Sequence, residues 1–244
     1  MGKIDLSEIV EYVEKNIIQF HHKRLEKLQQ LQLNKILRKK NPYLFKAKSI
    51  DTAQDYVKNI LDAFLSSQEE GIFGHFLEEL AIFINSRVYN GKKSEWEGMD
   101  LEFEKDQIKY IVSIKSGPNW GNSDQIKQMR HNFEQVKKHL ILQNSSLTVV
   151  PANGCCYGRD NKPNKGDYLK LCGQRFWSFI SGNDHLYTEI IEPLGHQAKQ
   201  INQDFMEQYA QIINRFTFEF TKKFCNKTGQ IMWSKIVEFN SSSE

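Results

Sequence analysis

Apolar residues recur every three or four positions near the start of the chain, which predicts one α-helix over residues 5–40. From His22 onward this segment is rich in lysine and arginine, and Asn41-Pro42 ends it because the residue before a proline resists the helical conformation. A basic helical face is more often solvated than bound, so DNA contact by this helix is the less favoured alternative. The apolar positions that carry the pattern are Ile9, Val10, Val13, Ile17, Ile18 and Phe20.

Two further helices are predicted before the pattern changes. One covers residues 51–67 and begins at Asp51-Thr52, and the next covers residues 69–89 and ends before Gly91. Beyond that glycine, apolar residues recur at every second position, which is typical of β-strands.

A β-hairpin is predicted next. Residues 98–103 alternate polar and apolar side chains, residues 104–107 form a turn, and residues 108–115 are rich in β-branched and aromatic residues. Glycine, proline, asparagine and serine dominate residues 116–123, which therefore form a loop. The hairpin leads directly into this loop.

A helix is predicted over residues 124–142, with Asn122 as its cap and Gln125 in the reciprocal position of a capping box. A strand over residues 147–150 follows it. Strand, helix and strand over this length predict a parallel, right-handed crossover.

The remaining chain is predicted as a polar loop over residues 153–166 and helices over residues 167–181 and 196–226. Helices, then a small mixed β-sheet, then more helices predict an α/β three-layer core with helical additions at both ends. We expect a single elaborated domain over residues 1–244. Its parts are an N-terminal helical region (1–68), a core that carries the candidate chemistry (69–152), and the polar loop with the C-terminal helices (153–244).

The composition narrows the class of protein. Apolar residues make up 39% and aromatic residues 12% of the 244-residue chain, which argues against a disordered protein. With 33 basic and 30 acidic residues the net charge is +3, so any nucleic-acid binding must come from basic residues placed locally. The sequence has no run of about 18 apolar residues, which argues against a membrane span.

The first residues reach acidic side chains at once, so no export signal is predicted. We therefore expect a cytoplasmic protein whose four cysteines are reduced. Cys155 and Cys156 are adjacent rather than spaced as in a zinc knuckle. A small metal site of Cys155, Cys156 and Cys172 is a less favoured alternative to plain packing.

The predicted hairpin places acids near an amine. Strand residues two apart share a face, so Asp100 lies on the same face as Glu102, and on the partner strand Lys115 lies on the same face as Ser113. A lysine at a strand end is costly to bury unless an acid pairs with it. A carboxylate that binds Mg²⁺ beside an ammonium that stabilises developing negative charge is suited to phosphodiester hydrolysis.

This spacing resembles that of the PD-(D/E)xK nuclease superfamily, with Asp100, twelve residues, and then Ser113-Ile114-Lys115. The preceding helix contains Gly74-His75-Phe76-Leu77-Glu78, similar to the Gly-x-x-Leu-Glu helix that supplies an extra acid in many members. More specifically, three runs resemble the type II restriction endonucleases of the PmeII-like group, over roughly residues 45–240. These runs are residues 112–123, 154–158 and 172–177.

The resemblance implies a restriction-endonuclease-like α/β core and assigns roles within it. Asp100, Glu78 and the main-chain carbonyl of Ile114 would bind Mg²⁺, and Lys115 would join Asp100 and Glu78 as a catalytic residue. Met99 replaces the usual proline without chemical consequence. Ser113 replaces the usual acid, so the site lacks one carboxylate.

Four glutamates could supply the missing carboxylate: Glu78, Glu79, Glu102 and Glu134. Glu78 is preferred because it occupies the Gly-x-x-Leu-Glu position, and Glu102 is second because it shares a face with Asp100. Helical periodicity alone does not choose between Glu78 and Glu79, because they flank the apolar face on opposite sides.

Two loops are candidates for DNA contact. The loop over residues 116–123 leads into a helix N-terminus, whose free N–H groups favour phosphate. Arg159 in the long polar loop is a candidate for reading guanine, because arginine binds guanine bidentately in the major groove. The DNA-binding candidates are Asn119, Asn122, Ser123, Gln125 and Arg159.

The resemblance also implies a Mg²⁺-dependent endodeoxyribonuclease that cuts both strands of double-stranded DNA at a short specific site. We expect a homodimer, joined through the N-terminal or late helices, and a cognate methyltransferase that protects the host DNA. Two alternatives stay open. One is a structure-selective DNA repair nuclease with the same core, and the other is a DNA-binding protein in which Ser113 marks a decayed catalytic site.

Overall fold

The computed structural model describes residues 5–243, so the first four residues of the segment searched for an export signal lie outside the described residues. The chain forms two compact units. Unit 1 combines the residues up to Ile17 with Phe73–His196, and unit 2 combines Ile18–Ile72 with the residues from Gln197 onward. The expectation of a single nuclease domain over residues 1–244 stays a prediction.

The predicted boundaries of the first helices are wrong in two places. The helix expected over residues 5–40 is two helices, because Gln32 adopts an extended conformation between them. The helices expected over residues 51–67 and 69–89 are one, because the polar residues at the expected break stay helical; Ser67 donates a hydrogen bond to the Ala63 carbonyl inside the helix. The bounds are α1 (Leu6–Gln29), α2 (Leu33–Lys39), α3 (Pro42–Ala47) and α4 (Ala53–Tyr89).

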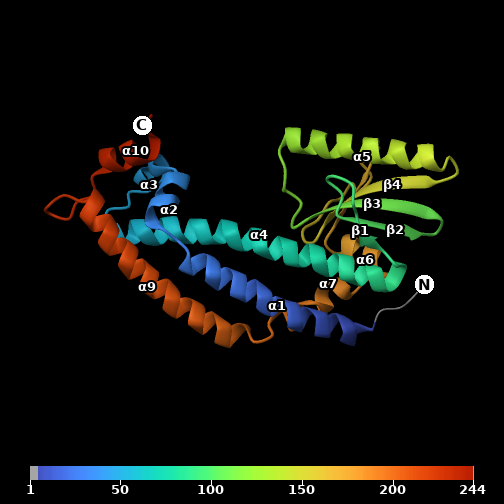
Figure 1. The fold of residues 1–244 in the computed structure, drawn as a ribbon, viewed down its shortest axis with the longest axis horizontal. Coiled ribbons are helices and arrows are strands. Elements are labelled where there is room, and N and C mark those ends of the chain that lie inside the picture. Colours follow the sequence, from blue (N-terminus) through green and yellow to red (C-terminus); the bar gives the residue numbers. More distant parts are fainter. Residues whose placement is uncertain (1–4, 244) are drawn as a thin grey trace. The chain divides into compact units, whose positions relative to one another are not determined.

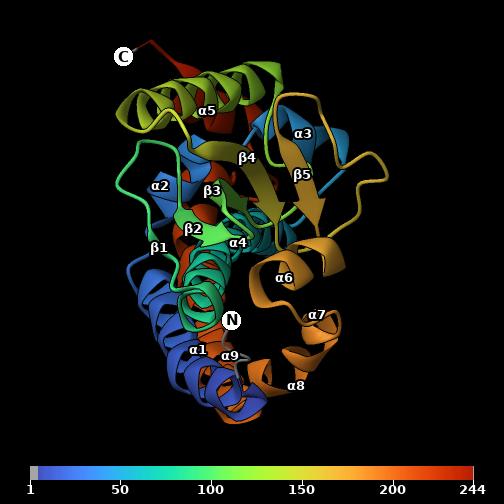
Figure 2. The same ribbon diagram turned by 90° about the vertical axis from the view of Figure 1, so that its right-hand side faces the viewer.

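Unit 1 is built on a mixed five-stranded sheet in the order β1-β2-β3-β4-β5 (Figure 2). The predicted hairpin is confirmed, with Asp106 and Gln107 both at positive φ in its turn, as a tight hairpin turn requires. The predicted parallel crossover is also confirmed, since β3 and β4 run parallel. The strands are β1 (Lys92–Lys93), β2 (Leu101–Lys105), β3 (Ile108–Lys115), β4 (Thr148–Cys155) and β5 (Leu169–Cys172).

The helix expected over residues 167–181 is wrong in its first part, which contains strand β5. Residues 169–172 pair in parallel with β4, and the helix begins only at Gln174, as α6 (Gln174–Ser181). A four-residue strand is too short to show a period of two, so the helical signal of the following residues masked it. Two short helices, α7 (Leu186–Glu189) and α8 (Ile191–Leu194), complete the unit and were not predicted.

Helices cover both faces of the sheet, which confirms the three-layer α/β core. Helix α5 (Ser123–Gln143) lies along one face, and α6 lies on the opposite side (Figures 1 and 2). The predicted capping box of Asn122 and Gln125 begins α5. On the α6 side, the ring of Phe179 meets the rings of Phe103 and Tyr110 edge-on. The α5 side is packed with Met99, Ile111, Met129, Phe133, Val136 and Val149.

Unit 2 is helical. The predicted late helix is confirmed as α9 (Ala198–Phe224), and α10 (Trp233–Ser241), which was not predicted, follows it. Tyr56 of α4 stacks on Phe220 of α9 inside the shared core. Within the described part of the chain, no helix is long and apolar enough to cross a bilayer.

A close contact between β4 and α6 gives a testable expectation for stability. A Cβ atom at Gly154 would lie 2.2 Å from the fully buried ring of Phe176. We expect Gly154→Ala to destabilise the protein by roughly 1–3 kcal/mol, because an overpacked core must shift. Gly71→Ala in α4, where no atom lies within 4 Å, is the matched control and should leave the melting temperature unchanged or raise it. Thermal unfolding of both variants measures the difference, and equal melting temperatures would contradict it.

Candidate active site

The structure brings Asp100 and Lys115 together at the end of the hairpin. Asp100 precedes β2, and its N–H donates to the Val112 carbonyl at 2.8 Å. Its Oδ2 accepts a hydrogen bond from the N–H of Ile114 at 2.6 Å and lies 3.5 Å from Nζ of Lys115. The carboxylate and the ammonium therefore meet where β3 ends.

Lys115 is held by three neighbours. Besides the Asp100 carboxylate, its Nζ donates to the carbonyl oxygen of Ile114 at 2.8 Å. The same nitrogen lies 5.6 Å from the centre of the Trp120 ring, within reach of a cation–π attraction. The side chain is 32% exposed, so the amine is fixed in position yet open to a substrate.

Glu78 of α4 faces this pair. Burial and the negative charge of Asp100 raise the pKa of the half-buried Glu78 carboxyl, and the positive charges of Lys93, His75 and Lys115 partly oppose the shift. Nζ of Lys93 lies 3.7 Å from its carboxylate. Glu78 therefore belongs to the same electrostatic cluster as Asp100 and Lys115.

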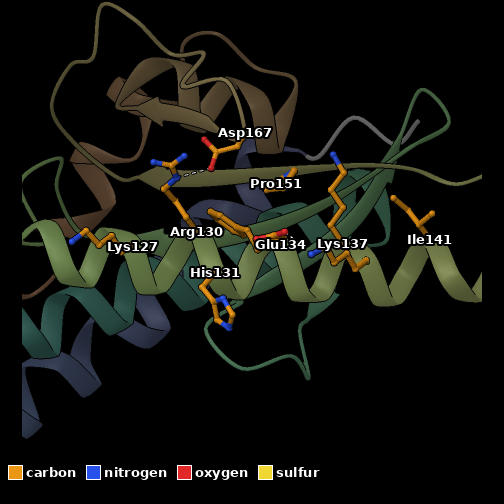
Figure 3. Close-up of a pocket in the computed structure, with 10 residues that line it drawn as sticks. Lys127, Arg130, His131, Glu134, Lys137, Ile141, Pro151 and Asp167 are labelled. Carbon is orange, nitrogen blue, oxygen red and sulfur yellow. Dashed lines mark hydrogen bonds and ion pairs between the residues drawn. The ribbon is translucent and has the colours of Figure 1, made fainter.

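The other glutamates proposed for the missing acid are engaged elsewhere. Glu79 pairs with His75 at 3.4 Å, with both side chains about half exposed. Glu102 is buried and pairs with Lys109 at 2.8 Å. Glu134 pairs with Lys138 on the exposed face of α5, at the border of a hollow of about 630 Å³ that Arg130 and Asp167 also line (Figure 3).

A buried asparagine that the sequence analysis missed connects the site to its surroundings. Nδ2 of Asn153 on β4 donates to the carbonyl of Ser113 at 3.1 Å, and its Oδ1 accepts from Nε1 of Trp120 at 3.1 Å. Asn153 thus fixes the indole that lies beside Lys115. A polar residue inside an apolar strand was the available signal, although it does not reveal these partners.

The three runs that carried the family resemblance interlock at this edge of the sheet. The ring of Tyr157 lies against Gly117, where a Cβ atom would come within 2.3 Å of it. Gly158, at φ +90°, packs on Pro118, and Gly173, at φ +56°, leaves space for the Gly158 carbonyl. These close contacts explain why the runs are rich in glycine.

The predicted DNA-binding residues are exposed at or beside the same edge. Asn122 and Gln125 use their side-chain oxygens in the α5 cap, so their amide N–H groups are the parts left for other contacts. The side chains of Asn119 and Arg159 are exposed and have no hydrogen bond or ion pair with any residue from 5 to 243. Ser123 is exposed in the first turn of α5.

The cysteines are free and buried, and a metal site of Cys155, Cys156 and Cys172 is not formed. Burial raises the pKa of Cys156 to about 12 and also raises that of Cys155. The thiols of Cys155 and Cys156 are therefore uncharged near neutral pH, and they pack as small apolar side chains.

The hairpin end offers hard oxygen atoms, which are the ligand type that Mg²⁺ prefers. Burial, and after it the negative charge of Asp100, raises the pKa of Glu78, and a divalent cation would relieve the repulsion between the two carboxylates. The Ile114 carbonyl adds a third hard oxygen. Among residues 5–243 no group of three His, Cys, Asp or Glu side chains could hold a metal. Such a sparse set suits Mg²⁺, which usually keeps several of its waters.

Comparison with known protein families finds a match. A family model described as type II restriction endonuclease EcoO109I matches residues 7–202, which is most of the chain. No curated protein matches the chain.

Proposed function

Because the chain belongs to the EcoO109I family of type II restriction endonucleases, we propose that it hydrolyses both strands of double-stranded DNA at a short specific site, with Mg²⁺ as cofactor. The observation that carries the proposal is the cluster of Asp100, Lys115 and Glu78 at the end of the hairpin. The narrower PmeII-like grouping stays a prediction.

Each residue of the cluster has a chemical role in this proposal. Asp100, Glu78 and the Ile114 carbonyl would hold Mg²⁺, which supplies a Lewis acid for the scissile phosphate and lowers the pKa of water. The Lys115 ammonium stabilises the negative charge that develops on the phosphate oxygens. The Ile114 N–H keeps Asp100 aimed at the site, and Trp120 and Asp100 keep the ammonium in place.

Cutting both strands favours two copies of the chain on a two-fold DNA site, since each active site then addresses one strand. We propose that the protein is a homodimer in the cytoplasm and that a cognate methyltransferase protects the host DNA. Sedimentation with and without a DNA duplex measures whether the protein is a homodimer.

Digestion of plasmid and genomic DNA tests the function. With Mg²⁺ we expect discrete fragments whose sequenced ends share one short motif, and with EDTA we expect intact DNA, because the oxygen ligands need the ion. Cleavage without a shared motif would indicate a structure-selective nuclease. Binding without any cleavage would indicate a decayed site, and either result overturns the proposal.

A further inference from the structure

A second pocket opens at the same edge of the sheet as Lys115. It has a volume of about 390 Å³ and is lined by the loop that follows β4, the end of β5, the start of α6 and Tyr187 of α7. Lys115 is the register partner of Cys155, and Cys155 is the register partner of Cys172. Two strand spacings of about 4.8 Å therefore separate the end of β3 from the end of β5.

The charge of this pocket is positive. Arg159 and Arg175 both line it, and Arg159 has no hydrogen bond or ion pair with any residue of the described range. Asp160 is the one acid in the lining, and its carboxylate lies 2.9 Å from Nζ of Lys165 and 3.9 Å from Nζ of Lys170. Neither guanidinium group therefore forms an ion pair with an acidic side chain of the described residues.

The backbone around the pocket holds Arg175 in place. Arg175 donates one N–H of its guanidinium to the Asp160 carbonyl at 2.9 Å, so its other donors stay available. Lys170 donates to the carbonyl of Pro118 at 2.8 Å, which connects β5 to the loop after Lys115. The start of α6 lies in the same lining, and its N-cap, Gly173, provides no side-chain cap. The free N–H groups there add to the positive potential.

We propose that this pocket binds a backbone phosphate of the cleaved DNA strand, through Arg159 and Arg175. Phosphate is the ligand that paired guanidinium groups and helix N–H groups favour. The strands of DNA advance about 3.4 Å per nucleotide along the helix axis, so two strand spacings correspond to a phosphate within about three nucleotides of the cut. Arg159 then positions the strand rather than reading a base edge. This inference rests on the proposed function.

The test compares three variants on a short duplex of mixed sequence in the presence of Ca²⁺. Arg159→Ala and Arg175→Ala should each weaken binding by roughly tenfold at low salt, and each should reduce the slope of log Kd against log salt by about one. Lys162→Ala is the matched control, because it removes one exposed charge from the same loop without lining the pocket. It should leave that slope unchanged.

Arg159→Ala is the decisive variant, because it breaks no hydrogen bond or ion pair within the described residues. Equal melting temperatures of Arg159→Ala and wild type check this. If the wild type cuts DNA while neither arginine variant changes the salt slope, the pocket assignment is wrong and the proposed function stands. If Lys162→Ala lowers the slope as much as Arg159→Ala, the loop contributes only diffuse charge, and the assignment is again wrong. If the wild type neither binds nor cuts DNA, both proposals fall together.

Discussion

Lys115→Ala is expected to lower the rate of DNA cleavage in Mg²⁺ by roughly 10²–10³-fold, because the charge that develops on the phosphate loses its nearest ammonium. The side chain is one-third exposed and its ion pair with Asp100 is partly solvated, so its removal should change stability little. Asp100→Asn should have a similar effect on the rate. Asparagine retains an oxygen acceptor for the Ile114 N–H and loses the charge that would bind the metal.

Two controls separate a loss of chemistry from a loss of structure or binding. Lys105→Ala removes a lysine from the opposite end of the same hairpin and should cut DNA at the wild-type rate. Both site variants should still bind DNA in Ca²⁺, which takes the same kind of oxygen ligands. Normal cleavage by Lys115→Ala and Asp100→Asn would place the active site elsewhere.

Glu78→Gln is the second variant with a large expected effect, again of roughly 10²-fold or more in rate, whereas Glu79→Gln should be mild. The two residues are adjacent on α4, but burial and the charge of Asp100 raise the pKa of the Glu78 carboxyl, whereas Glu79 pairs with His75. Single-turnover cleavage at saturating enzyme measures both. A larger loss for Glu79→Gln would reverse the assignment.

The raised pKa of Glu78 also predicts how the Glu78→Gln substitution changes the stability of the folded protein. A carboxyl whose pKa is higher in the folded than in the unfolded state costs stability while it is charged, above the folded pKa, and this cost disappears as the pH falls below the unfolded value. Glu78→Gln removes the cost, so its melting temperature near neutral pH should not fall below that of the wild type. The variant would then lose activity without losing stability, which distinguishes a metal ligand from a structural residue.

Local signals in the sequence predicted local structure well. The capping box of Asn122 and Gln125 is confirmed, and the turn predicted over residues 104–107 is confirmed within narrower bounds, at Asp106 and Gln107. Both features depend on neighbours within a few positions. The four residues of β5 depend on pairing with β4, which no local pattern contains, and they were mistaken for helix.

In the candidate site, too, the sequence predicts what depends on local geometry and does not predict what depends on distant elements. The spacing of Asp100 and Lys115 on a hairpin was enough to place them together, because strand geometry fixes which residues meet. The sequence does not show that Glu78 lies near the charge of Asp100, and it does not show that Asn153 binds Trp120. Contacts between distant elements are set by tertiary packing, which periodicity does not encode.

The segment between Lys115 and Asn122 is fastened at several points: Trp120 to Asn153, the Pro118 carbonyl to Lys170, and Asn122 to the first turn of α5. A chain segment that is already rigid loses little conformational entropy when a ligand arrives. The free protein should therefore already hold this loop in the conformation that it has when DNA is bound. Hydrogen exchange at the Asn122 amide, which donates to Oε1 of Gln125, should be slow in the free protein and should change little in the complex.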